Sequence, residues 1–354
     1  MVYMRKIIVA ELNMTKAEHL SFNSCILDEL KNQYHIKFYC QNAHSSLLSD
    51  DSIDDIDIHN VYVVAGKNRN FIRKFAVEVF NAIKIIITNK NSSIVFLSAF
   101  PPALVFIALF AKIVNCDVNV FLHGELKGLR GSSKITSYSF WIKFYFKSGL
   151  YKSIKNIVIG KHIYNEIIKF PYMKDVNLHF INHPISIKNN IKIKTIEFAS
   201  IGYARGKIYD DLFSVINKSE KKFHHIGMVS DEIYNKFYDS NIVFHVKPGD
   251  ALSQTEYIQL LSKVKFSVFY YNDDYALTTS GAMLDAVSCS SVIITLRNVF
   301  AEYLKTNCYP VIVCNDTEDI VDLLNTSMDY LNEIEKNNIC YAQGIFKNVL
   351  QEVL

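Results

Sequence analysis

The sequence predicts an α/β fold of two domains, each built on a parallel β-sheet with helices on both faces. Three observations support this prediction. First, 354 residues are too many for one ordinary hydrophobic core. Second, short apolar segments alternate with longer helical segments, which is the pattern of β-α-β units in a parallel sheet. Third, a segment rich in lysine and asparagine at residues 187–194 interrupts the alternation and is typical of a linker.

The first predicted domain spans residues 1–183. A capping box at Thr15 and Glu18 marks the start of its first helix. Pro101 and Pro102 divide the longest apolar segment, so this segment predicts a strand and a helix rather than a membrane span. Strands are predicted at residues 6–10, 36–40, 61–65, 94–98, 118–122, 156–159 and 178–181, and helices at residues 15–30, 70–87, 103–115, 135–152 and 162–170.

The second predicted domain spans residues 184–354 and repeats the same alternation. Ser253 and Glu256 form a second capping box at the start of a helix. The last segment, residues 318–354, is predicted to be mostly helical and could return to the first domain. Strands are predicted at residues 196–201, 222–226, 241–246, 266–269, 292–295 and 311–314, and helices at residues 209–217, 253–262, 281–288 and 299–304.

The composition is that of a globular protein and excludes several other classes. Half of the residues are hydrophobic and 21% are charged, and the net charge of +3 gives no support to nucleic-acid binding. The seven cysteines are widely spaced and include no C-x-x-C pair, which argues against a zinc site or a disulfide framework. The apolar run at the N-terminus is too short for a secretion signal. We therefore expect a protein of the reducing cytoplasm.

A polar stretch at residues 270–287 joins a strand end, a loop and a helix start. Ser280 and Gly281 open that helix, whose first backbone amides have no partners within the helix. In open α/β sheets a strand, a loop and a helix N-terminus of this kind accept phosphate groups. The second domain is therefore expected to bind a phosphate-containing ligand.

Three segments of the second half resemble the GT-B glycosyltransferases that use nucleotide sugars in bacterial polysaccharide and lipopolysaccharide synthesis. Residues 201–207 resemble the loop whose Arg and Lys hold the donor diphosphate. Residues 248–266 are similar to the segment that precedes the donor loop, and residues 270–295 resemble the glycine-rich loop with its following helix. This resemblance, which extends to the large retaining group 1 family, implies two Rossmann-like domains with a donor/acceptor cleft between them.

The same resemblance implies that the second domain holds a nucleotide-diphosphate sugar as donor substrate, with no metal and no other cofactor. Arg205 and Lys207 would neutralise the negative charge that develops on the leaving diphosphate. Asp285 would contact hydroxyl groups of the nucleotide's ribose. The other donor-binding candidates lie in the loop and at the helix start, and they are Tyr271, Thr278, Ser280 and Gly281.

In the first domain, His123 and Glu125 follow a predicted strand and are the candidate catalytic residues. Members of the resembled family often carry a histidine at this strand end, near the donor sugar. His123 would contact a sugar hydroxyl or a phosphate, and Glu125 would act as a base if the enzyme inverts the anomeric centre. Arg130, a few residues further along, would hold an anionic acceptor or donor.

The donor loop departs from the pattern of the retaining enzymes, which carry two glutamates eight positions apart. Counting back from Asp285 gives Leu277, which cannot replace a carboxylate. Either the first acid is absent, or Asp273 or Asp274 has taken a related role through a shifted loop. Retention and inversion of the anomeric centre both stay open.

The predicted helix at residues 135–152 combines aromatic residues with lysines. It is expected either to pack against the core with a basic rim or to touch an anionic membrane in which a lipid-linked acceptor resides. In the second case the protein would be peripheral on the inner face of the plasma membrane.

The sequence thus predicts a transferase that adds a sugar to a surface glycan such as O-antigen, capsule or lipooligosaccharide, with a lipid-linked acceptor favoured. Its expected partners are a nucleotide sugar, this acceptor and the anionic membrane, and they do not include nucleic acid. One alternative is a non-catalytic subunit of the same fold, which Leu277 favours. The other is a nucleotide-sugar 2-epimerase, which would need more acid/base residues than the sequence reveals.

Overall fold

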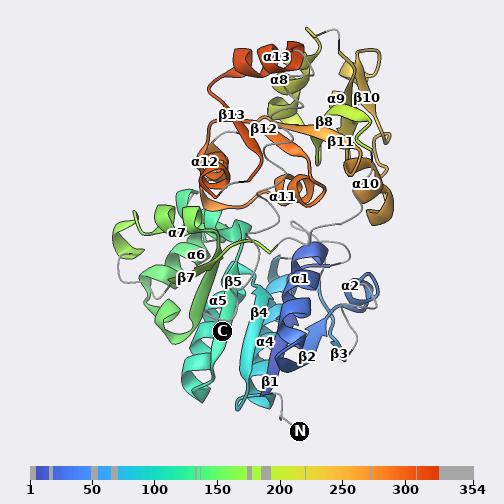
Figure 1. Ribbon diagram of the computed structural model, residues 1–354. Helices are drawn as coiled ribbons and strands as arrows, with labels where there is room; N and C mark the ends of the chain where they lie inside the picture. Colours follow the sequence, from blue (N-terminus) through green and yellow to red (C-terminus); the bar gives the residue numbers. More distant parts are fainter. Residues whose placement is uncertain are drawn as a thin grey trace. The chain divides into compact units, whose positions relative to one another are not determined.

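The computed structural model describes residues 5–15, 19–48, 55–64, 71–131, 134–135, 137–173, 178–184, 193–219, 221–271, 273–307 and 309–326. These residues form two compact units, which Figure 1 shows in blue to green and in yellow to red. The first unit takes the chain up to Pro184, together with the segment Leu277–Thr279. The second unit takes the remaining described residues.

The described part of the first unit contains one seven-stranded sheet in the order β3-β2-β1-β4-β5-β6-β7, and all neighbouring strands are parallel. The order reverses beside β1, because β2 lies on one side of it and β4 on the other. Ligands of open α/β sheets bind at the carboxyl ends of the strands that meet at such a reversal. The strands are β1 (Arg5–Glu11), β2 (Tyr34–Cys40), β3 (Asp57–Asn60), β4 (Ser93–Ser98), β5 (Val118–Leu122), β6 (Lys155–Ile159) and β7 (Leu178–Ile181).

Helices cover both faces of this sheet, because alternate residues of each buried strand point to opposite faces. Ile8 and Ala10 of β1 pack with α4 (Phe71–Thr88), α5 (Pro101–Val114) and α6 (Tyr138–Lys147). Ile7 and Val9 pack with α1 (Leu20–Lys31) on the other face. None of the described helices combines the length and the apolarity needed to cross a bilayer. The shorter helices of this unit are α2 (Asn42–Ser45), η1 (Gly124–Arg130), η2 (Leu150–Ser153), α7 (Lys161–Ile167) and η3 (Pro171–Met173).

The second unit repeats this architecture with a six-stranded parallel sheet in the order β10-β9-β8-β11-β12-β13. Its order reverses between β8 and β11, which are direct neighbours. The strands are β8 (Ile196–Ile201), β9 (Phe223–Ile226), β10 (Ile242–Phe244), β11 (Val264–Phe269), β12 (Val292–Leu296) and β13 (Val311–Cys314).

Helices again cover both faces. Phe198 and Phe266 pack with α8 (Gly206–Ile216), α9 (Asp231–Phe237) and α13 (Thr317–Asn325). Ala199 and Phe269 pack with α10 (Gln254–Leu261), α11 (Gly281–Ser288) and α12 (Val299–Thr306). The loop between β11 and α11 contains one further short helix, η4 (Asp273–Leu277). Both units have the strand order of the dinucleotide-binding fold, so the predicted α/β class with two Rossmann-like domains is confirmed.

Local signals explain most of the element boundaries. The capping box of Ser253 and Glu256 is present, with both reciprocal hydrogen bonds, and it starts α10 as predicted. The capping box predicted at Thr15 and Glu18 lies partly outside the described residues, and α1 begins at Leu20. The predicted helical ending after residue 326 also lies outside the described residues.

Two predicted elements of the first unit are wrong. The strand predicted at residues 61–65 is instead β3 at Asp57–Asn60, because an edge strand does not need the continuous apolar run on which the prediction relied. The helix predicted at residues 135–152 divides into α6 and η2. Gly149 separates them in the left-handed conformation (φ 76°), which typically ends a helix.

Candidate functional site

In the second unit, two helix N-termini lie at the strand reversal. The chain leaves β8 at Gly202 and enters α8 at Gly206, and it returns from β11 to enter α11 at Gly281. The two loops are close, because a Cβ added to Gly202 would lie 3.9 Å from Cβ of Ala282. The first amides of both helices therefore open toward the edge of the sheet at which a phosphate is expected.

Arg205 is the N-cap of α8 and Lys207 lies in its first turn, because the helix begins at Gly206, earlier than the predicted residue 209; both side chains are exposed. The guanidinium of Arg205 lies 5.0 Å from the ring centroid of Tyr203, in a cation–π contact. Within the described part of the chain, neither residue takes part in an ion pair. Two positive charges thus stand at the reversal point without an ion pair to any described carboxylate, which suits an anionic ligand.

Ser280 and Tyr271 shape the start of α11. The hydroxyl of Ser280 caps the helix by accepting a hydrogen bond from the amide of Met283 at 3.3 Å. It also lies 3.5 Å from the hydroxyl of Tyr271, whose ring stacks on Tyr275 with centroids 4.0 Å apart. Gly281 is exposed, and a Cβ there would meet no atom within 4 Å. These residues give the helix N-terminus a defined and accessible geometry.

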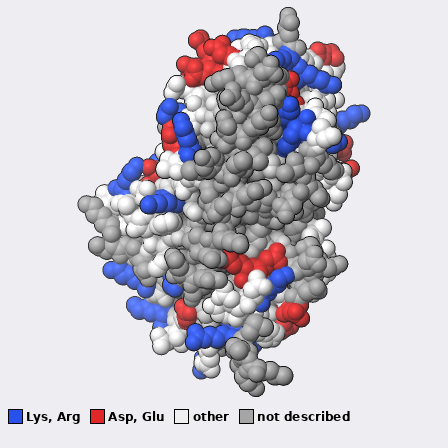
Figure 2. Space-filling model, in the orientation of Figure 1, with Lys and Arg blue, Asp and Glu red and all other residues white. Residues whose placement is uncertain are grey.

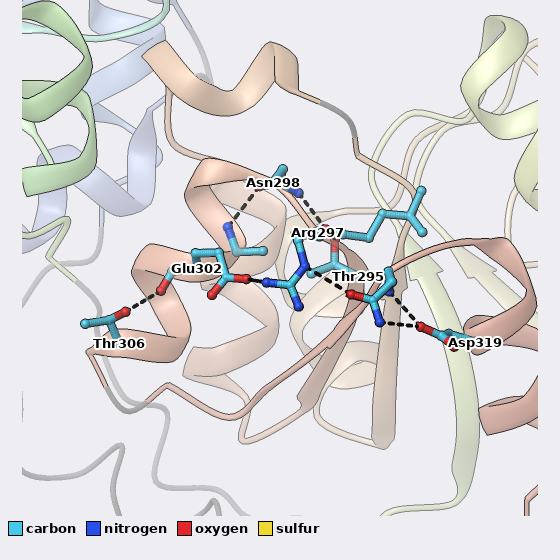
Figure 3. Close-up of polar contacts among 9 residues, drawn as sticks. Thr295, Arg297, Asn298, Glu302, Thr306 and Asp319 are labelled. Carbon is cyan, nitrogen blue, oxygen red and sulfur yellow. Dashed lines mark hydrogen bonds and ion pairs between the residues drawn. The ribbon is translucent and has the colours of Figure 1, made fainter. Parts of the chain in front are cut away.

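The backbone of Tyr271 is held from the next loop by Asn298, which the sequence did not single out. The Nδ2 amide of Asn298 donates to the carbonyl oxygens of Leu296 (2.9 Å) and Tyr271 (3.3 Å). Its Oδ1 accepts from the amide of Ala301 at 2.9 Å and caps α12 (Figure 3). One buried side chain therefore connects the end of β12, the start of α12 and the start of the loop between β11 and α11.

Asp285 lies in the second turn of α11 and is partly buried. The hydroxyl of Tyr257, on α10, donates a hydrogen bond to Oδ2 of Asp285 at 3.2 Å. Burial raises the pKa of Tyr257 well above its usual range, and the charge of Asp285 raises it further, so Tyr257 remains a donor. Asp285 thus has a partner that links two helices, and its contact with a ribose stays a prediction.

Leu277 and Thr278 belong to the first unit although the sequence around them belongs to the second. Leu277 is 1% exposed and lies in the apolar core cluster of the first unit. The backbone carbonyl of Thr278 lies 3.4 Å from Nε2 of His162. The side chains of Asp273 and Asp274 are outside the described part of the structure, so their suggested role stays a prediction.

At the strand reversal of the first unit, the sequence analysis missed Glu11, the fully buried last residue of β1. Its Oε1 accepts hydrogen bonds from the amides of Asn13 and Met14, both at 3.1 Å, and from the hydroxyl of Ser98 at the end of β4. Its Oε2 accepts from the side-chain amide of Asn23 at 3.3 Å. The signal in the sequence was a carboxylate directly after an apolar strand.

His123 follows β5 at the same edge. Its Nε2 carries the proton, because it donates to the carbonyl oxygen of Leu97 at 2.7 Å, which leaves Nδ1 as an acceptor when the ring is neutral. The ring lies 4.4 Å from that of His19, centroid to centroid. Burial lowers the pKa of His123 well below its usual value, and the nearby His19 and His183 lower it further. His123 is therefore neutral near pH 7.

Glu125 lies in η1, and its Oε1 accepts the backbone amide of His123 at 2.8 Å. Burial raises the pKa of Glu125 to about 7, and the charge of Glu11 contributes in the same direction. A carboxylate with a pKa close to neutrality can take up and release a proton under physiological conditions, as a general base must.

A third carboxyl, Glu78 on α4, was also missed because nothing in its local sequence marks it. It is 2% exposed, and its Oε1 accepts the amide of Phe100 at 2.7 Å. It thereby supports the start of α5, whose first two residues are prolines without amide protons. Burial raises the pKa of Glu78 well above its usual value, and the charges of Glu11 and Glu125 raise it further. Three carboxyls from β1, α4 and η1 thus share one electrostatic environment.

Arg130, the predicted acceptor contact, ends η1 and pairs with Glu166 on α7 at 3.3 Å. Its side chain is about half exposed, so the ion pair contributes little to stability. Its contact with an acceptor stays a prediction. In the described part of the chain, no group of three or more His, Cys, Asp and Glu side chains is arranged to hold a metal ion.

At the strand reversal of the second unit, two glycines and a histidine fix the loops after β8 and β9. Gly227 (φ 138°) packs directly on Gly202, and a Cβ at Gly227 would lie 2.0 Å from the carbonyl oxygen of Gly202. Buried His225 accepts a hydrogen bond from the hydroxyl of Ser200 (2.8 Å) and donates from Nε2 to the carbonyl oxygen of Met228 (3.0 Å). A glycine at position 227 therefore allows the close approach of its backbone to that of Gly202.

Comparisons with known proteins agree with this architecture. No family model matches the sequence, and no curated protein is significantly similar to it. Several solved structures do match. HepE from Anabaena, in complex with UDP and glucose, matches over 97% of this chain and 96% of its own, with 12% identity and a TM-score of 0.65. The lipopolysaccharide outer core galactosyltransferase WaaB matches over 99% and 100%, with 12% identity and a TM-score of 0.56.

A Listeria monocytogenes protein named as a candidate UDP-N-acetylglucosamine 2-epimerase also matches, over 97% of this chain and 92% of its own, with 9% identity and a TM-score of 0.57. The similarity to all three extends over both units. The chain therefore has the GT-B fold that the sequence predicts.

Replacing Gly227 by alanine should destabilise the second unit by about 2 kcal/mol or more, because the new Cβ meets backbone and the positive φ is strained. Urea unfolding of the purified variant measures this loss. Gly249→Ala is the matched control, since Gly249 also has a positive φ (87°) but no atom within 4 Å of an added Cβ. Equal losses in the two variants would contradict the proposed backbone contact.

Burial lowers the pKa of His225 to about 4 in the folded protein, whereas an unfolded histidine titrates near 6.5. The stability contributed by neutral His225 is therefore complete above pH 6.5 and is lost as the pH falls toward 4. The free-energy loss caused by His225→Gln should consequently be smaller at pH 5 than at pH 7.5, by about 2 kcal/mol. Urea unfolding at both pH values tests this, and a loss that does not change with pH would refute it.

Proposed function

We propose that the protein is a glycosyltransferase that transfers a sugar from a nucleotide-diphosphate donor to a glycan acceptor. The observation that carries the proposal is the pair of exposed cations, Arg205 and Lys207, at the strand reversal of the second unit beside two helix N-termini. The fold supports it as well, because HepE, which has a similar fold, was solved with UDP and glucose.

The donor chemistry follows from charge. When the glycosidic bond of a nucleotide sugar breaks, the negative charge increases on the leaving diphosphate. Arg205, Lys207 and the first amides of α8 and α11 would stabilise this charge without reorganising. In this proposal they bind the diphosphate without a metal ion, Tyr271, Thr278, Ser280 and Gly281 line the donor site, and Asp285 contacts the ribose.

For the acceptor, Glu125 is the proposed base. With its pKa raised to about 7, it would accept the proton of the attacking hydroxyl, while neutral His123 lies beside it and contacts a hydroxyl or a phosphate. A single base suits inversion of the anomeric centre. Buried Leu277 supports the same outcome, because the donor loop has no carboxylate at that position.

The proposed acceptor is a surface glycan, with a lipid-linked one favoured and Arg130 in contact with its anionic part. WaaB, which has a similar fold, is a galactosyltransferase of the lipopolysaccharide outer core. This similarity supports a hexose or a related sugar as the transferred group.

A 2-epimerase is the second candidate. A 2-epimerase needs several acid/base groups, and the first unit contains more of them than the sequence revealed. Besides Glu125 and His123, the buried carboxyls of Glu11 and Glu78 lie in the same electrostatic environment. The two activities are distinguished by incubating the protein with UDP-sugars and following the anomeric protons by NMR. Epimerisation changes the sugar while leaving it attached to UDP, whereas transfer or hydrolysis releases UDP.

The double variant Arg205→Ala/Lys207→Ala should bind UDP at least about tenfold more weakly and lose transfer, because two charge-assisted contacts to phosphate are removed. Isothermal calorimetry measures the affinity, and circular dichroism checks the fold. Lys218→Ala is the control, since Lys218 is also exposed but follows the opposite end of α8. Unchanged UDP affinity in the double variant would refute the donor-site assignment.

Glu125→Gln should lower the rate of transfer by about a hundredfold or more while leaving the UDP affinity unchanged, because the amide cannot accept the proton. In the original protein, kcat/KM should rise with pH through about 7, where the Glu125 carboxyl ionises, and this rise should disappear in the variant. Steady-state kinetics across pH 5.5 to 8.5 provide the test. A variant that keeps the full rate and the same profile would exclude Glu125 as the base.

A further inference from the structure

The outward face of α4, α5 and α6 forms a continuous surface on the first unit. These helices cover the same side of the sheet, because their buried residues share one core cluster. They lie side by side, since Phe75 of α4 contacts both Phe106 of α5 and Trp141 of α6, with ring centroids 5.3 and 6.4 Å apart. Their outward sides therefore point in the same direction.

This surface is unusually apolar. On α4, Ile72, Phe80 and Ile87 are 78%, 66% and 51% exposed, and their spacing places them along one side of the helix. Leu109 and Ile113, on successive turns of α5, and Phe144 of α6 are exposed as well. Single exposed apolar residues are ordinary, but six on three adjacent helices mark an interaction surface.

The same helices are strongly basic, although the whole chain carries 38 basic and 35 acidic residues. Their only acidic residue is Glu78, which is buried and points toward the start of α5. On the one face that Figure 2 draws, blue basic side chains appear along the left and lower border of the first unit. The basic residues of the three helices are Arg73, Lys74, Lys84, Lys112, Lys143 and Lys147.

We propose that this surface docks the protein on an anionic lipid bilayer. The apolar side chains would enter the headgroup region, and the lysines would extend their stems along it to reach lipid phosphates. The sequence analysis considered only the helix at residues 135–152, but the structure adds α4 and α5, which carry most of the exposed apolar residues. The inference rests on the proposed glycosyltransferase function, because docking on a bilayer would bring such an enzyme to a lipid-linked glycan acceptor.

Flotation with phosphatidylcholine vesicles, with and without phosphatidylglycerol, tests the proposal. The full-length protein should float with anionic vesicles only, and less at high salt because surface charges are screened. Phe80→Ser/Ile113→Ser should reduce the bound fraction at least about tenfold through lost apolar contact. Lys84→Glu/Lys112→Glu should do the same through charge reversal.

The matched controls lie on the second unit, where Tyr238→Ser and Lys218→Glu alter exposed residues outside the surface and should leave flotation unchanged. No binding of the original protein to anionic vesicles at low salt would overturn the proposal. The proposal would also be overturned if the original protein formed a dimer and did not bind vesicles, and if Phe80→Ser/Ile113→Ser dissociated this dimer. The surface would then be an interface with a second copy of the chain. UDP affinity separates the docking proposal from the proposed glycosyltransferase activity. If the original protein binds UDP but not anionic vesicles, only the docking proposal is rejected.

Discussion

The reversal of strand order in each sheet is the constraint on which the candidate sites depend. The carboxyl ends of parallel strands all lie at one edge of the sheet. Successive connections from this edge cross to the same face of the sheet, except where the strand order reverses. There the two connections leave toward opposite faces of the sheet. In the first unit this happens after Glu11 and Ser98, whose side chains meet, and in the second unit after Gly202, which faces the first turn of α11.

The two reversal points have opposite chemistry. The second unit presents exposed cations and the N-termini of two helices, which attract an anion. The first unit collects partly or fully buried carboxyls and neutral histidines, whose pKa values move toward or below neutrality because burial disfavours their charged forms. One edge is thus suited to binding phosphate and the other to transferring a proton. A glycosyl transfer needs both, since one group leaves as an anion and another gives up a proton.

The sequence predicted the parts that depend on local pattern. Continuous apolar runs located the buried strands, and residues directly after them, such as His123 and Arg205, could be assigned to the sheet edges. It could not reveal partners that are distant along the chain. Glu78 reaches Phe100 from another helix, and Tyr257 reaches Asp285 across 28 residues, so both contacts appear only when the helices pack. The outward surface of α4, α5 and α6 was likewise hidden, because it arises from three separate segments.

Leu277 illustrates how packing changes the meaning of a sequence difference. In the sequence it is a missing carboxylate and an argument for lost activity. In the structure it is a core residue of the first unit, 1% exposed, where a carboxylate would lose its hydration. The apolar residue is therefore what this position requires for stability, and its presence does not argue that catalysis has been lost. In the proposed reaction the acid or base would then come from another position, and Glu125 of η1, whose pKa is raised to about 7, is the candidate.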